Sequence, residues 1–539
     1  MAKPKTPNQK RKYGELNKRL AKYVMLVESI YEDLNLEAAK IVGITDFTID
    51  SDRTFMWSDY PQTRKRIRDL QERFVEDIGS VIYSGTSEEW KNSNEVQDLL
   101  ANKVLQTYGA TIGKEKYEIL YQPNNDALKA FQQRKDKGFT ISDKLWNQST
   151  LYKQELEEAI SCAIQKGTSA ITLSKQISKY LLDFPQLQKD YKERFGKASR
   201  AMDCEYRSIR LAASEINMAY RQAENLRWQQ MDFVVGYEIK LSNNHTCNGK
   251  PFQDICDILA GKYPKDFQWT GWHPLCRCYK IPILKTEEEF WEWDGRNEAT
   301  TASVNEVKDV PDAFKKWVLD NQERISTAKK RNTLPYFLRD NKSVYQKITV
   351  ESSISEIVKR ASSVGDEVQS IAERIAIKNG GYVTPINFKS TTSITRKVIT
   401  EGITPYDIKG AVRTTIIVPK SRIEDVLEEL YKTEGFLRLK RQKPESFMGY
   451  SGNIVNIRTT NGLTAEIQVN TERMIFAKER PEDAKRILGK KRWEEIHNET
   501  GMEGGLGHKY YEQWRILDKS SNEALKIVEK SIEYYSHFR

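Results

Sequence analysis

Residues 406–418 read YDIKGAVRTTIIV and residues 465–469 read AEIQV, and these two stretches predict the central strands of the carboxyl-terminal part of the chain. The β-branched run RTTIIV favours a strand. Side chains alternate in AEIQV, so Glu466 and Gln468 point to one face of a second strand while the isoleucine and valine point to the other. One face of the predicted sheet is therefore polar and the opposite face packs against a core.

The sequence around these strands predicts an α+β domain. Residues 454–457 and 463–469 read as a hairpin joined through Asn461-Gly462, a dipeptide typical of tight turns. Apolar side chains at helical spacing predict helices over residues 354–375, 423–430 and 522–535. We expect residues 348–539 to form this domain around a mixed sheet.

The first half of the chain is predicted to be mostly α-helical. Apolar residues recur at intervals of three and four over residues 12–44, and a further helix is expected from about Ser199 to Trp228. The same pattern covers residues 60–133, where we expect the glycines at 79, 85 and 109 to interrupt it.

The middle of the chain changes character. Residues 240–283 hold four of the 6 cysteines and two of the 5 histidines, with several glycines and prolines, which predicts a compact, loop-rich module. Residues 296–347 are polar and are predicted to form a tether. The expected organisation is a helical region, a second domain that contains the module, a polar linker and the α+β domain, over residues 1–139, 140–290, 291–347 and 348–539.

Composition excludes several classes of protein. The 539 residues are 38% hydrophobic and 30% charged, enough for three or four cores, and no stretch approaches the apolar length of a membrane span. The amino-terminal residues lack an apolar segment, so we expect no secretory signal and synthesis in the cytosol. Six cysteines are too few for a disulfide scaffold, and a net charge of +10 permits contact with nucleic acid without requiring it.

The cysteine-rich module supplies candidate zinc ligands. Zinc binds four nitrogen or sulfur ligands in a tetrahedron, and the module offers six, namely His245, Cys247, Cys256, His273, Cys276 and Cys278. One residue separates Cys276 from Cys278, which is closer than in common zinc knuckles. Two interpretations stay open: a structural zinc site, or small buried thiols with His273 hydrogen-bonded beside Pro274.

The same residues carry a resemblance. NHTC at 244–247, Cys256, and HPLCRC at 273–278, together with the upstream helical stretches at 161–177 and 212–223, resemble the Mu-type phage head morphogenesis family over residues 140–285. The resemblance implies a minor head protein that enters the procapsid near the portal. It implies phage portal and capsid proteins as partners, with packaged DNA as a further partner.

The carboxyl-terminal sequence gathers groups suited to phosphoryl or pyrophosphoryl transfer. Cations come first, with Lys389, Ser393 and Lys397 in FKSTTSITRKV. Asp407 precedes the first predicted strand and Arg413 begins it. Asp407 and Glu466 could share Mg²⁺, or Glu466 could act as the base for an attacking hydroxyl, while Lys389, Lys397 and Arg413 hold triphosphate oxygens. Tyr450 could stack on a purine.

This ordered set resembles the synthetase domain of the RelA/SpoT alarmone synthetases, a nucleotidyltransferase-like fold. The resemblance implies transfer of pyrophosphate from ATP to the hydroxyl of a purine nucleotide, with Asp407 on the magnesium ion, Glu466 near the acceptor, and Gln468 on the same strand. The sequence departs from the family pattern in three places. The spacing from Asp407 to Arg413 is wider, no histidine follows Tyr450, and Asn470 stands where the family has an arginine after the glutamine that corresponds to Gln468. These departures concern the choice of acceptor.

Together the two resemblances predict a phage or prophage minor head protein with a carboxyl-terminal effector, a toxin located in the virion and then in the host cytoplasm. The alternative is a structural minor capsid protein whose last domain binds a nucleotide or a partner without catalysis. Incubation with ATP and candidate acceptors distinguishes the two.

Overall fold

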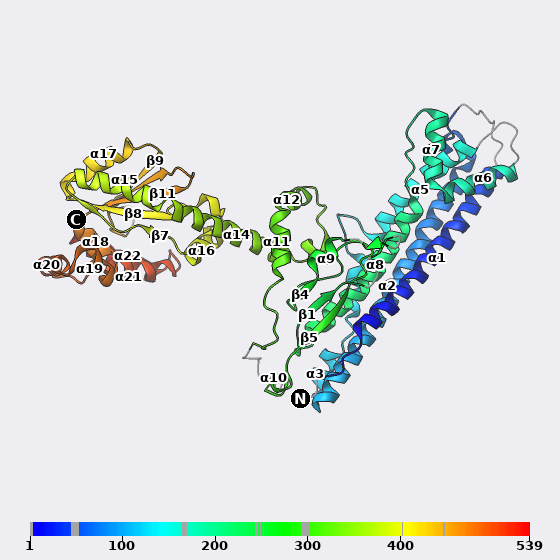
Figure 1. Cartoon of the computed structure of the whole chain (residues 1–539), viewed down its shortest axis with the longest axis horizontal. Coiled ribbons are helices and arrows are strands. Elements are labelled where there is room, and N and C mark those ends of the chain that lie inside the picture. The colour runs from blue at the N-terminus through cyan, green and yellow to red at the C-terminus, as the bar shows by residue number, and fades with distance from the viewer. Residues whose placement is uncertain are drawn as a thin grey trace. The chain divides into compact units, whose positions relative to one another are not determined.

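The computed structural model describes residues 4–44, 53–163, 170–242, 246–247, 250–251, 253–292, 302–401, 403–445 and 448–539. The chain divides into two compact units, Met1–Tyr345 and Gln346–Arg539 (Figure 1). The first unit is mostly helical and the second combines helices with a mixed sheet, so the predicted multidomain fold class is confirmed.

Four long helices run alongside one another in the first unit (Figure 1), namely α1 (Gln9–Ile44), α2 (Arg64–Tyr108), α5 (Ile141–Ala163) and α8 (Cys204–Gln230). Shorter helices complete this layer: η1 (Trp57–Asp59), η2 (Pro61–Thr63), α3 (Lys114–Leu120), α4 (Asn125–Gln133), α6 (Ala170–Leu182) and α7 (Phe184–Phe195). Asp203 caps α8 because its side chain accepts a hydrogen bond from the amide of Tyr206. The predicted amphipathic stripes become the buried faces of these helices.

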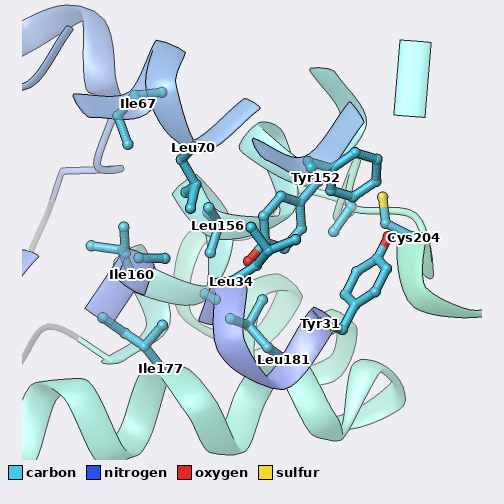
Figure 2. Close-up of a cluster of buried hydrophobic side chains, with 14 of the residues drawn as sticks. Tyr31, Leu34, Ile67, Leu70, Tyr152, Leu156, Ile160, Ile177, Leu181 and Cys204 are labelled. Carbon is cyan, nitrogen blue, oxygen red and sulfur yellow. The ribbon is translucent and has the colours of Figure 1, made fainter. Parts of the chain in front are cut away.

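A continuous core joins the helices at one end of the bundle. Figure 2 shows aliphatic side chains from α1, α2, α5 and α6 meeting around Tyr31 and Tyr152. The Tyr152 hydroxyl donates a hydrogen bond to Asn35 Oδ1 at 2.6 Å, so the polar atom of this buried ring is satisfied.

Helix α2 differs from the sequence prediction. It continues through Gly79 and Gly85 and ends at Gly109, which adopts a left-handed conformation with φ 64°. A Cβ atom at Gly85 would lie 2.5 Å from Cδ1 of Ile216 in α8. Gly85 therefore permits two helices to approach closely and does not mark a helix end.

The loop-rich module contains an antiparallel sheet in the order β4-β1-β5, with β1 at Val234–Lys240, β4 at Gly261–Tyr263 and β5 at Tyr279–Leu284. A two-stranded ribbon, β2 (Thr246–Cys247) with β3 (Lys250–Pro251), and helix α9 (Ile255–Leu259) lie between β1 and β4 in the chain. Helix α10 (Glu287–Glu292) follows β5.

The described part of the expected linker is folded, which the polar composition did not predict. Residues 302–345 include α11 (Asp312–Asp320), α12 (Gln322–Lys330) and α13 (Tyr336–Arg339). Phe314 and Phe337 are buried, and the Phe337 ring packs against Trp272 of the module with ring centres 5.3 Å apart. A few aromatic anchors hold this polar segment within the first unit.

The second unit is built on a six-stranded sheet with the order β6-β8-β11-β10-β9, and β7 also pairs with β8. The strands are β6 (Tyr382–Val383), β7 (Asn387–Phe388), β8 (Val412–Ile417), β9 (Phe436–Gln442), β10 (Gly452–Arg458) and β11 (Thr464–Asn470). Strands β8 and β11 are parallel, and the predicted hairpin β10–β11 is antiparallel.

Helices cover one face of this sheet. The helices before β11 are α14 (Lys342–Ser363), α15 (Gly365–Lys378), α16 (Thr391–Glu401), η3 (Pro405–Asp407), η4 (Lys420–Arg422) and α17 (Ile423–Tyr431). Figure 1 shows α15 and α17 lying over the sheet, where Ile467 and Val469 join the same buried core as Val368 and Leu430. The single helix predicted over residues 354–375 is two helices, which are separated at Val364, where φ is −116° and ψ is 10°. Gly365 begins α15, and a Cβ atom there would lie 2.7 Å from Cζ of Phe388.

The last five helices form a small cluster with its own core. They are α18 (Glu472–Lys478), α19 (Pro481–Leu488), α20 (Lys490–Thr500), α21 (Leu506–Arg515) and α22 (Asn522–Ser536), and Phe476, Tyr534 and Phe538 are buried among them. A Cβ atom at Gly507 would overlap the Tyr535 hydroxyl, so the glycine-rich start of α21 serves close packing.

Candidate functional site in the carboxyl-terminal unit

Parallel strands β8 and β11 place the predicted site residues next to one another. Glu466 pairs with Arg413 in the strand register, and Gln468 pairs with Thr415. Paired residues on adjacent strands share a face, and Ile467 and the other alternate residues of β11 are buried in the core on the opposite face. Glu466, Gln468 and Arg413 therefore share the polar face of the sheet.

The polar face extends as a row across five strands. Register pairs connect Asn387 to Arg413, Arg413 to Glu466, Glu466 to Asn456 and Asn456 to Arg438. Arg438 Nε donates a hydrogen bond to Asn456 Oδ1 at 2.8 Å. The row thus places a carboxylate between two guanidinium groups, an arrangement that could hold an anionic ligand beside a base.

The Glu466 carboxylate is confined at both of its oxygens. Gln468 Nε2 donates a hydrogen bond to Glu466 Oε1 at 2.6 Å. A Cβ atom at Gly410 would lie 2.9 Å from Glu466 Oε2, and Gly410 has φ 71°. Because Gly410 has no side chain, the Glu466 carboxylate can occupy the adjacent space. This role was not predicted from the sequence, although the glycine lies within YDIKGAVRTTIIV.

Lys478 joins the site from the end of α18. Its Nζ donates a hydrogen bond to Gln468 Oε1 at 3.0 Å and lies 5.6 Å from the centre of the Tyr450 ring. Burial lowers the pKa of Lys478, but the nearby Tyr450 and Glu479 outweigh burial and raise it above its usual value. Lys478 is thus a cation at neutral pH, and the chain Lys478–Gln468–Glu466 links it to the carboxylate.

Asp407 and Lys389 lie on the two segments that flank the start of β8. Asp407 ends η3, is exposed, and accepts a hydrogen bond from Thr404 Oγ1 at 2.8 Å. The amide of Lys389 donates a hydrogen bond to the Ala411 carbonyl at 2.9 Å, directly after Gly410. The Lys389 bond holds its segment at the start of β8, and the Gly410 amide, three residues after Asp407, donates to the Thr464 carbonyl of β11 at 3.3 Å.

Ser393 and Lys397 lie one turn apart on α16, so they share a helix face. The Ser390 hydroxyl lies 2.9 Å from that of Ser393 near the start of the helix. Their contact with a nucleotide stays a prediction.

Tyr450 is positioned by packing. Its hydroxyl accepts a hydrogen bond from Asn470 Nδ2 at 2.7 Å, and its ring meets Tyr535 edge to face with centres 5.6 Å apart. The ring thus bridges the sheet and the terminal helices beside Lys478. Stacking of the Tyr450 ring on a purine stays a prediction.

A cavity of about 840 Å³ lies elsewhere in this unit, beyond the carboxyl ends of β8 and β11. Its arginines are largely paired with carboxylates: Arg441 with Glu424 through Nη2 at 2.6 Å, and Arg492 with Glu472 at 2.8 Å. Glu466 and Arg413 do not line it. We therefore place the site on the row of the polar face.

The first unit gathers part of the predicted zinc set. The sulfur atoms of Cys256, Cys276 and Cys278 lie within 4.8 Å of one another, and His273 contacts Cys256. His245 lies outside the described residues, and Cys247 belongs to strand β2.

Within the described ranges, no helix has the length and apolar character that crossing a membrane requires. Searches of protein-family models returned no match to this chain.

One curated protein, the (p)ppApp synthetase toxin Tas1 of Pseudomonas aeruginosa (strain UCBPP-PA14), is 35% identical over 181 residues. The match covers 33% of this chain and 41% of that protein, so the chain spans about two fifths of that relative's length. A crystal structure of the Type VI effector Tas1 in complex with its immunity protein is also 35% identical, covering 35% of this chain and 97% of that one, with a TM-score of 0.33. The identity to a (p)ppApp synthetase supports the RelA/SpoT-like domain predicted for the carboxyl-terminal part of this chain.

Proposed function

We propose that the second unit transfers pyrophosphate from ATP to the hydroxyl of a purine nucleotide and acts as a toxin. The observation that carries this proposal is the pairing of Glu466 with Arg413 on parallel strands, inside a polar row that ends in Arg438. The 35% identity to a (p)ppApp synthetase toxin favours an adenine nucleotide as the acceptor.

The charged side chains of the row and their neighbours have roles in this reaction. The acceptor oxygen bonds to the β-phosphorus of ATP, AMP leaves, and Glu466 takes the proton of the acceptor hydroxyl. The hydrogen bond from Gln468 fixes the carboxylate, and Lys478 fixes Gln468. Arg413 and Arg438 hold phosphate oxygens, and Lys389 and Lys397 add positive charge from the neighbouring segment.

Magnesium would fit the carboxylates near the start of β8. Asp407 is exposed and Glu466 is half-buried, and hard carboxylate oxygens are the ligands that Mg²⁺ prefers beside phosphates. A bound Mg²⁺ would neutralise charge on the triphosphate. Asp407 is the residue that would hold it, because Glu466 serves as the proton acceptor in this reaction.

For the whole chain we propose a phage or prophage minor head protein that carries this effector. The module with Cys256, His273, Cys276 and Cys278 supports the proposal, because the motif that resembles the head morphogenesis family forms one folded region with the helices that precede it. Portal and capsid proteins are the proposed partners, with packaged DNA as a further one, and the virion interior followed by the host cytoplasm is the proposed location. An immunity protein in the producing cell is a further proposed partner.

The enzyme proposal is tested with the full chain, Mg²⁺ and ATP labelled in its β- and γ-phosphates. ADP, AMP, GDP and GTP are offered separately as acceptors, and Glu466→Gln is the matched inactive variant. A labelled 3′-pyrophosphorylated product with an adenine acceptor supports the proposal. Absence of product with every acceptor overturns it and leaves the structural alternative, a binding domain without catalysis.

The head-protein proposal has a separate test. Particles purified after prophage induction are analysed by mass spectrometry, and the chain should copurify with capsid and portal proteins. Its absence from intact particles would contradict this part of the proposal without affecting the enzyme assay.

A further inference from the structure

Three buried thiols in the first unit are spaced as ligands of one metal ion. Cys256 Sγ lies 3.8 Å from Cys276 Sγ, and both atoms lie within 4.8 Å of Cys278 Sγ. Zinc–sulfur bonds of about 2.3 Å in a tetrahedron place two sulfur atoms roughly 3.8 Å apart. The three cysteines come from two segments, α9 and the turn before β5, so folding has brought them together.

His273 supplies a nitrogen beside the Cys256 sulfur, which is shared with the cysteine cluster. His273 Nε2 lies 3.1 Å from Cys256 Sγ, and the other ring nitrogen, Nδ1, lies 2.7 Å from the Pro274 carbonyl oxygen. A proton on Nδ1 would donate to that carbonyl and leave the lone pair of Nε2 facing Cys256 Sγ. Histidines that bind metals commonly donate their second N–H to a backbone carbonyl in this way.

Asp254 is a less suitable fourth ligand, although its carboxylate lies 3.4 Å from His273 Nε2. It already caps α9 by accepting a hydrogen bond from the amide of Cys256 at 2.7 Å. Zinc sites with three thiolates commonly take histidine or cysteine as the fourth ligand. Asp254 therefore positions α9 and contacts His273, and we do not count it among the zinc ligands.

The long helix α8 supports the backbone of the ligands. Arg221 is buried, and its Nη2 donates hydrogen bonds to the carbonyl oxygens of Cys276 at 2.7 Å and of Cys278 at 2.8 Å. Asn217 Nδ2 donates to the Cys276 carbonyl at 2.9 Å. Zn²⁺ with three thiolates carries one net negative charge, which the buried guanidinium balances.

We propose that Cys256, Cys276, Cys278 and His273 bind one structural zinc ion. With all four positions filled by protein ligands, the ion would have no open site for a substrate. It would instead connect α9 to the turn before β5 and hold both against α8. The proposal concerns the first unit and does not depend on pyrophosphate transfer by the second.

The direct test is the metal content of the full chain. The protein is purified under reducing conditions, incubated with Zn²⁺ and desalted, and zinc is then measured by inductively coupled plasma mass spectrometry. We expect one zinc ion per chain, and a large loss in Cys256→Ser and Cys278→Ser. Cys162→Ser, which alters a buried cysteine of α5 outside the cluster, is the matched control and should retain the zinc.

A second measurement remains informative when the cysteine variants fail to fold. Cobalt replaces zinc in the unaltered chain, and tetrahedral cobalt bound to thiolates gives intense visible bands together with sulfur-to-metal charge-transfer absorption. These bands should change in His273→Asn and persist in Asp254→Asn.

Three results would overturn the assignment. These are no retained zinc with no thiolate–cobalt bands, a disulfide between Cys256 and Cys276 in the freshly purified chain, or metal loss in Asp254→Asn with no change in His273→Asn.

Discussion

Glu466 and Arg413 occupy partner positions on the two parallel strands of the carboxyl-terminal sheet, so their side chains leave the same face. The pairing places a carboxylate that can accept a proton beside a guanidinium that can bind phosphate. Substitutions at and around this pair should therefore change the rate of pyrophosphate transfer more than they change the stability of the fold.

Replacing Glu466 with glutamine should abolish most pyrophosphate transfer. The amide keeps the size of the side chain but cannot accept the proton of the attacking hydroxyl, and removal of a general base lowers rates by about 10²- to 10⁴-fold. The rate of product formation under saturating ATP measures the loss, and circular dichroism checks the fold. Glu434→Gln, at an exposed position in the turn before β9, should keep the full rate. An active Glu466→Gln protein would contradict the role of this carboxylate.

Replacing Arg413 with alanine should weaken transition-state binding. The guanidinium is exposed on the polar face, where it can donate two parallel hydrogen bonds to a phosphate. We expect kcat/KM for ATP to fall by about 10²-fold, with partial recovery in Arg413→Lys because the charge returns without the planar fork. Arg374→Ala is the matched control, since Arg374 is exposed on α15, a helix that packs against the opposite face. Equal losses in the two alanine variants would argue against a phosphate contact.

Replacing Gly410 with alanine should impair catalysis more than it impairs folding. Its φ of 71° makes any side chain cost about 1 kcal/mol, and the new Cβ would lie 2.9 Å from Glu466 Oε2. Gly501→Ala carries a similar conformational cost at φ 64° but meets nothing within 4 Å. Urea denaturation should show similar destabilisation of the two variants, whereas the transfer rate should fall in Gly410→Ala alone. A normal rate in Gly410→Ala would show that the carboxylate tolerates displacement.

The stability of the first unit should decrease as pH rises through neutrality. Burial raises the pKa of Glu155 from 4.5 to about 8, although the amide of Cys204 donates a hydrogen bond to its carboxyl. Between these two values the unfolded chain releases the proton while the folded chain keeps it, so the free energy of unfolding falls with pH and levels off above about pH 8.

Glu155→Gln should remove this dependence, because the amide is neutral at every pH. Urea denaturation at about pH 5 and about pH 8 measures the change, expected to be a few kcal/mol in the unaltered chain and smaller in the variant. Glu193→Gln, exposed on α7, is the matched control and should keep the original slope. An unchanged slope in Glu155→Gln would assign the dependence to another group.

Local pattern in the sequence determined most elements of the second unit. The dipeptide Asn461-Gly462 predicted the hairpin, and Gly462 has φ 83° at that turn while β10 and β11 pair on either side of it. Alternation along AEIQV predicted that Glu466 and Gln468 share a face, because the period of a strand follows from backbone geometry.

Contacts between distant segments could not be predicted from such patterns. From the sequence Gly85 reads as a helix breaker, but in the structure it allows Ile216 to pack closely against α2. Residues 302–345 read as a tether, but the Phe337 ring packs against Trp272. Each depends on a partner far away in the chain, and local periodicity carries no information about that partner.

Local sequence patterns predicted the central strands, the apolar faces of the helices and the residue types of the candidate site. Tertiary structure alone decided that β8 pairs in parallel with β11, which sets Arg413 beside Glu466, and that α18 brings Lys478 to Gln468. The physical reason is that side-chain alternation is fixed within a strand by its backbone, whereas strand order and register result from burying the apolar faces of all segments together.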